Sequence, residues 1–187
     1  MAESMRGSLV VATPDLLDPN FARTVVLILE HSPEGAVGVV LNRPSATVLE
    51  EGMPGWAMLA APPSRVFVGG PVEPVAAIGL GRVPSGRSSS PEGRHAALFG
   101  EVCSIDLGSD PVLSVPDVEV VRVFAGYAGW GPGQLDDEVA ADGWFVVDRD
   151  DGDVFSGAPE VLWREVLRRQ PGPLRLFSTY PEDPSQN

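Results

Sequence analysis

The chain has 187 residues, with 26 Asp and Glu against 13 Arg and no Lys, which gives a formal net charge of −13. Nucleic acids and anionic membrane surfaces are bound through Lys and Arg, so this excess of acid disfavours both as partners. The absence of Lys excludes a Schiff-base enzyme, a Walker-type phosphate loop and a Lys general base. A hydrophobic fraction of 43% over this length suffices for one core, and we expect a single domain over residues 1–187.

Cysteine usage and the length of apolar runs indicate a cytoplasmic protein. Cys103 is the only cysteine, so no disulfide forms within the chain, as is usual in a reducing compartment. Strictly apolar runs are short, with five residues at 25–29 and six at 56–61, whereas a membrane-spanning helix needs about 20. His31 and His95 are not in metal-ligand spacing with Cys103. We therefore expect no membrane segment, no metal site and no cofactor.

The first half of the chain is predicted to form strands and one short helix. Consecutive apolar positions in 24–30 and 36–41, joined by Ser32-Pro33-Glu34-Gly35, predict a central hairpin with a type I turn. Thr47 and Glu50 have capping-box spacing, which predicts that a helix begins there. Further short strands are expected at 8–12, 65–68 and 75–80.

The second half is predicted to begin with an exposed, flexible loop at 82–94, which is rich in Ser, Gly, Pro and Arg. Its remaining elements are expected to be strands at 98–105 and 118–125, a helix after Pro132, a hairpin of 144–147 with 153–155, and a frayed tail at 181–187. Residues 160–169 predict an amphipathic helix with Trp163 on its apolar face. Because strands outnumber helices and include hairpins, the predicted class is α+β with a mixed sheet.

Three features that suggest chemistry also have a structural interpretation. The acidic segment 148–153 lacks EF-hand spacing, since Gly152 is fifth and Pro159 twelfth, and a hairpin turn is favoured. The glycine-rich segment 126–133 can present amides to an anion or allow close packing of a strand and a helix. Gln134 has the spacing to reach back to Gly131, and Cys103 lies in an apolar stretch where a thiol is usually inert.

Several motifs together resemble one bacterial family. In chain order they are Thr13-Pro14, Asp18-Pro19-Asn20-Phe21, Arg23-Thr24-Val25, Glu30-His31, Gly35 with Gly38, Leu41-Asn42-Arg43-Pro44, Gly69-Gly70-Pro71-Val72, Gly126-Tyr127-Ala128-Gly129-Trp130, Gly133-Gln134-Leu135, Glu138 and Trp144. Their order and spacing are similar to those of the AlgH/YqgE family. The resemblance implies a cytosolic α+β protein with a branched, partly barrel-like sheet, flanking helices and no agreed catalytic residues. Residues 81–116 depart from the family pattern, which commonly has a helix there.

Three classes of function remain open at the level of the sequence. The favoured one is a non-enzymatic binding or regulatory protein for a small ligand or a protein partner. The second is an enzyme acting on a small metabolite, with His31 or Glu138 as the acid–base group. The third is a transcriptional regulator, which the charge of −13 and the lack of a helix-turn-helix pattern disfavour.

A candidate ligand site follows from the ends of the predicted strands. Glycines at strand ends leave room for a ligand near the backbone, and Arg43 can hold a carboxylate or phosphate as a bidentate donor. The alternative is three unrelated turns, with Arg43 paired to a neighbouring acid. The hypothesis is that one partly open site is formed by Asn42, Arg43, Gly70, Tyr127, Trp130 and Gln134.

Overall fold

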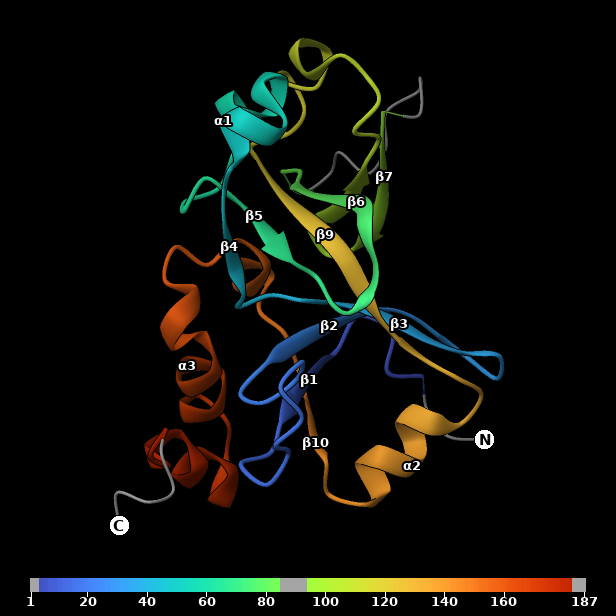
Figure 1. Ribbon diagram of the computed structural model, residues 1–187, viewed down its shortest axis with the longest axis vertical. Helices are drawn as coiled ribbons and strands as arrows, with labels where there is room; N and C mark the ends of the chain where they lie inside the picture. Colours follow the sequence, from blue (N-terminus) through green and yellow to red (C-terminus); the bar gives the residue numbers. More distant parts are fainter. Residues whose placement is uncertain (1–3, 85–93, 183–187) are drawn as a thin grey trace.

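A curled, branched β-sheet forms the body of the protein (Figure 1). The computed structural model describes residues 4–84 and 94–182, and within them the chain forms ten strands. Their bounds are β1 Leu9–Ala12, β2 Val25–Ser32, β3 Gly35–Val40, β4 Pro44–Val48, β5 Arg65–Val68, β6 Val72–Arg82, β7 His95–Phe99, β8 Val102–Ile105, β9 Val120–Trp130 and β10 Trp144–Val147.

The long strand β9 is the branch point of the sheet. The main path runs β10-β1-β2-β3-β9-β6-β8-β7, and all of its pairs are antiparallel. The end of β9 pairs with β3, with Ala36 opposite Trp130, while its middle pairs in parallel with β5, which in turn pairs with β4. The expected mixed, branched sheet and α+β class are therefore confirmed.

Short helices cover the sheet at three places (Figure 1). The α-helices are α1 Leu49–Gly52, α2 Gln134–Ala140 and α3 Leu162–Arg168. The 3-10 helices are η1 Pro54–Leu59, η2 Pro111–Leu113, η3 Asp151–Phe155, η4 Pro159–Val161 and η5 Gly172–Thr179. None of the helices in the described part of the chain is long and apolar enough to cross a membrane.

Apolar side chains of the sheet and helices form three clusters. The largest places Leu162, Trp163, Val166 and Leu167 of α3 against β1, β2, β3 and β9. A second lies under α2 and contains Trp130 and Trp144, and a third joins α1 and η1 to β8 and β9. The amphipathic helix and the burial of Trp163 are thus confirmed, although the α-helix itself begins at Leu162 after a 3-10 turn.

Arg122 of β9 is 1% exposed, and its partners within 4–84 and 94–182 are backbone carbonyls and an aromatic ring. Its guanidinium donates to the carbonyls of Ser156 and Pro62 at 3.0 and 2.6 Å and lies 4.1 Å from the Phe67 ring centroid. Burial lowers the pKa of Arg122 to about 10, because desolvation disfavours the charged form. This side chain fastens β9 to the chain around Pro62 and Ser156.

Several predicted elements are wrong. The short helix expected near 47–50 is present as α1, but Thr47 does not cap it, since 44–48 pairs with β5 as strand β4 and the N-cap of α1 is Val48 without a side-chain bond. Residues 98–105 are not one strand, because Gly100 takes a positive φ of 55° and the chain turns there between β7 and β8. The hairpin of 144–147 with 153–155 is absent, since β10 pairs with β1 and 151–155 forms η3.

The central hairpin of β2 and β3 is confirmed, with Ser32 paired to Gly35 across the turn. Of the predicted loop 82–94, Arg82 belongs to β6 and pairs with Val102 and Val120, so the loop begins later than expected. Residues 85–93 and the tail after 182 lie outside the described residues. The segment 81–116 holds β7, β8 and the 3-10 turn η2.

Candidate functional site

The loop 13–24 connects β1 to β2 and is fixed by its own polar side chains. Thr13 Oγ1 donates to the Asp142 carbonyl at 2.9 Å, and Thr24 Oγ1 donates to the Phe21 carbonyl at 2.7 Å. Within the loop, Asp18 Oδ1 accepts the Asn20 N–H at 2.8 Å, which is the Asx turn expected of an Asp-Pro-Asn segment. The loop therefore has a defined shape, and it borders four hollows of the surface.

Asn42 and Arg43, which follow β3, turn back and hold the end of this loop. Asn42 Oδ1 accepts the Val25 N–H at 2.9 Å, and its Nδ2 donates to the Arg23 carbonyl at 2.8 Å. The Arg43 guanidinium donates to the carbonyls of Pro19 and Ala22 at 2.8 and 3.1 Å. Among the residues that the structure describes, no acid is hydrogen-bonded to Arg43, although the alternative expectation paired it with one. Both residues act first as anchors of the loop.

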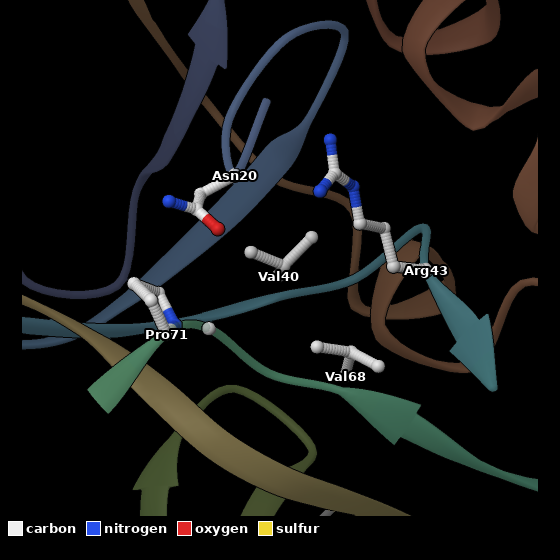
Figure 2. A pocket seen from close by; sticks show the side chains of 6 residues that line it. Asn20, Val40, Arg43, Val68 and Pro71 are labelled. Atoms are coloured by element: carbon white, nitrogen blue, oxygen red, sulfur yellow. The ribbon is translucent and has the colours of Figure 1, made fainter. Parts of the chain in front are cut away.

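The hollow beside Arg43 is small and carries one charge. It encloses about 60 Å³ and is lined by Asn20, Val40, Arg43, Val68, Gly70 and Pro71. Figure 2 shows Asn20 and Arg43 on the loop side, with Val40 and Val68 on the side of the strands. Burial lowers the pKa of Arg43, while the negative charge of Asp18 acts in the opposite direction. An anion entering this hollow would meet a partly desolvated cation.

Gly70 lines this hollow, and at Gly69 and Gly70 the chain crosses β9 at contact distance. A Cβ on Gly69 would lie 2.2 Å from the Gly126 carbonyl oxygen, and a Cβ on Gly70 would lie 2.2 Å from the Tyr127 carbonyl group. Gly70 also has a φ of +155°. The Gly-Gly-Pro motif is thus required by the crossing, whatever the hollow binds.

A larger cleft of about 310 Å³ lies between the loop 13–24 and α2 and is lined by aromatic rings. The rings of Phe21, Trp130 and Trp144 have centroids 5.6 to 6.1 Å apart. Glu138 Oε2 accepts both indole N–H groups, at 3.0 Å from Trp130 and 2.8 Å from Trp144. Gln134 completes the network, because it donates to Glu138 Oε1 at 2.8 Å and accepts the backbone N–H of Gly131 at 3.0 Å, as its spacing predicted.

The structure distributes the six expected site residues over several places. Arg43 and Gly70 line the small hollow, and Trp130 and Gln134 line the aromatic cleft. Asn42 lines a third hollow beside α3, and Tyr127 packs against the main core. The loop residues Asp18 to Phe21 lie between the first two, because Asn20 borders the small hollow and Phe21 the aromatic cleft.

The groups named for an enzyme are bound up in the fold. His31 Nδ1 accepts the Met5 N–H at 3.0 Å, and its Nε2 lies 3.2 Å from Asp136 Oδ2. A backbone N–H can only donate, so Nε2 carries the ring proton and donates to Asp136. Glu138 accepts three donors. Cys103 is buried, and burial raises the pKa of its thiol to about 11, so it stays protonated at neutral pH.

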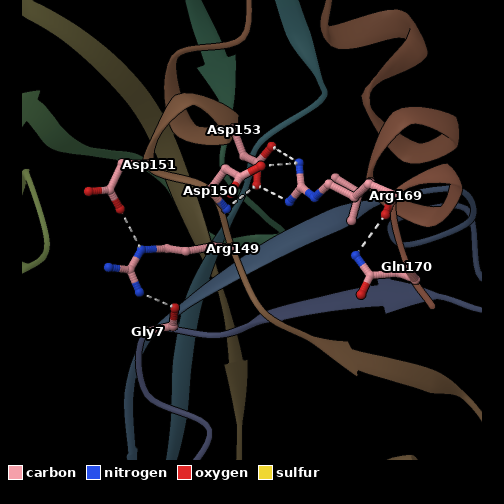
Figure 3. Close-up of polar contacts among 8 residues, drawn as sticks. Gly7, Arg149, Asp150, Asp151, Asp153, Arg169 and Gln170 are labelled. Atoms are coloured by element: carbon pink, nitrogen blue, oxygen red, sulfur yellow. Dashed lines mark hydrogen bonds and ion pairs between the residues drawn. The ribbon is translucent and has the colours of Figure 1, made fainter.

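Two arginines, Arg149 and Arg169, pair with three aspartates of the acidic segment 148–153 (Figure 3). Asp153, 5% exposed, accepts both guanidinium nitrogens of Arg169, while Asp151 accepts Arg149 Nε at 3.0 Å and the Glu101 N–H at 2.7 Å. Asp150 and Asp153 also form a capping box on η3. In the described part of the chain no group of three or more His, Cys, Asp and Glu is placed to hold a metal ion.

Sequence reasoning did not single out Asn20 or Arg23 as site residues. Both lie in the motifs 18–21 and 23–25, which were noticed only for the family resemblance. A signal was present, because three of the motifs fall within the single stretch 13–25, and an irregular segment of that kind often carries function.

Comparison with known proteins agrees with this architecture. A sequence model described as AlgH-like (DUF179) matches residues 9–175. The chain belongs to the AlgH-like family. A UPF0301 protein of Streptomyces coelicolor is 51% identical over 189 residues, covering 98% of this chain and 96% of its own length. A UPF0301 protein of Mycobacterium avium is 46% identical over 97% of this chain and 90% of its own.

Two solved structures share the fold. A crystal structure of a Corynebacterium diphtheriae protein matches with a TM-score of 0.89 and 33% identity, over 96% of this chain and 94% of that one. The solution structure of AlgH from Pseudomonas aeruginosa matches with a TM-score of 0.68 and 28% identity, over 98% and 100%. These comparisons establish the family and the fold, and they do not establish a biochemical activity.

Proposed function

We propose that this AlgH-like protein is a non-enzymatic binding protein of the cytosol that holds a small ligand by its carboxylate or phosphate group at Arg43. One observation carries the proposal. Arg43 is the single ionisable residue among those that line the hollow of Figure 2, in a chain of net charge −13. The small volume fits the anionic group, with the rest of the ligand in solvent or along the loop.

The hydrogen-bonding capacity of Arg43 supports this role. A guanidinium has five N–H groups, and the carbonyls of Pro19 and Ala22 use two of its nitrogens for one bond each. The remaining N–H groups can donate to a carboxylate or phosphate in the forked geometry that favours arginine. In this proposal Gly70 lines the pocket. Asn42 positions the loop 13–24, and Tyr127 positions the crossing of Gly70 over β9. Trp130 and Gln134 line the neighbouring aromatic cleft.

The state of the acid–base candidates favours binding over catalysis. A general base must have a free lone pair within reach of the substrate proton. His31 uses Nδ1 to accept the Met5 N–H and Nε2 to meet Asp136, so both ring nitrogens are engaged. Glu138 accepts two indoles and one amide, which occupy three of the about four acceptor positions of a carboxylate. These contacts hold α2 and the N-terminal segment in place, which is a structural task.

The test is a titration with acetate and with inorganic phosphate at constant ionic strength, followed by the ¹H–¹⁵N signals of Gly70 and of the Asn20 side-chain amide. Both signals are expected to shift in a saturable manner. The thermal midpoint should rise by about 3 °C at tenfold the dissociation constant, because binding then adds about 1.4 kcal/mol to the free energy of unfolding.

The variant Arg43→Gln should abolish these signal shifts. Arg65→Gln is the matched control, since Arg65 Nη1 also donates to two backbone carbonyls, those of Ser45 and Ala46. If Arg43→Gln responds like Arg65→Gln, or if neither Gly70 nor Asn20 responds in the unaltered protein, Arg43 does not form an anion site.

A further inference from the structure

Two arginines converge on a separate hollow between the loop 13–24, α3 and residues 178–182. This hollow encloses about 250 Å³ and is lined by Arg23, Asn42, Glu160, Trp163, Arg164 and Glu182, none of which lines the Arg43 pocket. The Arg23 guanidinium lies 4.2 Å above the ring centroid of Trp163. Arg164, the next residue on α3, is 30% exposed at its side chain and faces the same space.

The position of Arg23 is imposed by its surroundings. Its φ of 59° lies in the left-handed region, which is unfavourable for a residue with a Cβ. The Asn42 side chain holds the Arg23 carbonyl, and the Trp163 ring, fixed by its own hydrogen bond to the Ala12 carbonyl at 2.9 Å, supports the guanidinium. Backbone strain of this kind persists where neighbours over-determine a conformation, often at binding sites.

The two like charges disturb one another. Burial lowers the pKa of Arg23, and the positive charge of Arg164 lowers it further, whereas Glu182 acts in the opposite direction. A negative group between the two guanidiniums therefore relieves an existing repulsion. Such a group is the chemistry that the hollow favours.

In the free protein, groups of residues 178–182 contact both arginines, and the contact with Glu182 is weak. Arg23 donates to the carbonyls of Tyr180 and Pro181, Arg164 donates to the Ser178 carbonyl at 2.9 Å, and Arg164 Nη2 lies 3.8 Å from Glu182 Oε1. The Glu182 side chain is 82% exposed, so its ion pair is screened by water and easily exchanged. Glu160 also lines the hollow and adds a second negative charge that an incoming anion must tolerate.

We propose that Arg23 and Arg164 form a second anion site, which Glu182 occupies in the free protein and which a free carboxylate or phosphate group takes over. An incoming carboxylate or phosphate oxygen would sit between the guanidiniums and receive charge-assisted hydrogen bonds from both. Displacement of Glu182 sends its carboxylate into water, where it is already mostly solvated. The site acts independently of the Arg43 pocket.

The experiment uses the full chain and inorganic phosphate, with malonate as a carboxylate probe. The reporter is the indole ¹H–¹⁵N signal of Trp163, because its ring carries the Arg23 guanidinium and no tryptophan lines the Arg43 pocket. The signal is assigned by its loss in Trp163→Phe. In the unaltered protein we expect a saturable shift of this signal with at least one of the two probes.

Two variants with charge-matched controls decide the matter. Glu182→Gln should bind about two- to fivefold more tightly than the unaltered protein, the factor expected for an exposed ion pair. Arg164→Gln should bind at least about tenfold more weakly, since a charge-assisted hydrogen bond is lost. The controls are the exposed residues of the same helix, Glu165→Gln and Arg168→Gln, which change the net charge equally.

The result that overturns the proposal is a Trp163 signal that responds to neither probe, or Arg164→Gln binding as tightly as Arg168→Gln. Equal affinities of Glu182→Gln and Glu165→Gln would refute the displacement of Glu182. Arg164 does not line the Arg43 pocket, so Arg164→Gln should retain the responses of Gly70 and Asn20. Failure of the Arg43 pocket and failure of this site are therefore read from different signals.

Discussion

Replacing Trp163 by alanine tests whether α3 is an integral part of the core. The side chain is 3% exposed and belongs to the largest apolar cluster. Its indole N–H donates to the Ala12 carbonyl of β1 at 2.9 Å, and the Arg23 guanidinium covers its face. Truncation therefore removes apolar contact, a buried hydrogen bond and a cation–π contact at one position.

The expected loss in the free energy of unfolding is about 3 to 5 kcal/mol, the range for truncating a buried aromatic to alanine. Globular proteins have about 5 to 15 kcal/mol in total, so the variant should be folded but close to its limit. With a urea m-value of about 2 kcal/mol/M, the midpoint should fall by about 2 M. Urea unfolding followed by circular dichroism measures this directly.

Trp163→Phe separates packing from hydrogen bonding. It keeps a ring against the core and removes the donor to Ala12. Loss of this hydrogen bond should cost only about 0.5 to 1.5 kcal/mol, in addition to the cost of replacing the indole by a smaller ring. A loss below about 1 kcal/mol for Trp163→Ala would refute the reasoning and would mean that α3 is peripheral to the core.

Three further outcomes are expected. Gly70→Ala should lower the free energy of unfolding by more than about 4 kcal/mol or prevent folding, because its Cβ would lie 2.2 Å from the Tyr127 backbone. Gly152→Ala is the control measured by thermal unfolding, and it should cost under about 1 kcal/mol because the space around Gly152 is open. Glu138→Gln should cost about 1 to 3 kcal/mol in urea, since its new amide turns a donor toward another donor. The stability advantage of the unaltered protein over Cys103→Ala should fall as pH rises from about 9 to about 11, because the Cys103 thiol ionises in the unfolded chain before it ionises when buried. The comparison with Cys103→Ala is needed because the lowered pKa of Arg122 acts in the opposite direction.

The sequence predicted correctly those elements whose own pattern of apolar residues determines which side is buried. The apolar runs of β2 and β3 and the amphipathic face of α3 are legible because their periodicity reports burial directly. The errors lie where distant pairing overrides local preference. Thr47 has a cap's spacing but is drawn into β4 by β5, and 144–147 pairs with β1 rather than with the residues that follow it.

The candidate site was predictable only in part, for a related reason. The sequence marked Asn42, Arg43 and Gly70 as unusual, and two of them do line one hollow. Their spacing could not show that Asn42 and Arg43 fold back onto carbonyls of the loop 13–24, because those contacts cross about 20 residues of chain. Arg23 was not identified as a site residue because its role depends on contact with Trp163 and on the nearby Arg164, which are about 140 residues away in the sequence.

The position of β9 at the branch of the sheet has a consequence for how the chain folds during synthesis. β3 and β6 emerge from the ribosome early, but their hydrogen-bonding edges are completed only by β9, and β1 waits longer still for β10. Sheets closed by such distant pairings have high contact order and fold slowly. Until β9 is synthesised, the apolar hairpin of β2 and β3 exposes an open strand edge that can pair with other chains. A fragment that ends before residue 120 is therefore expected to aggregate rather than to fold.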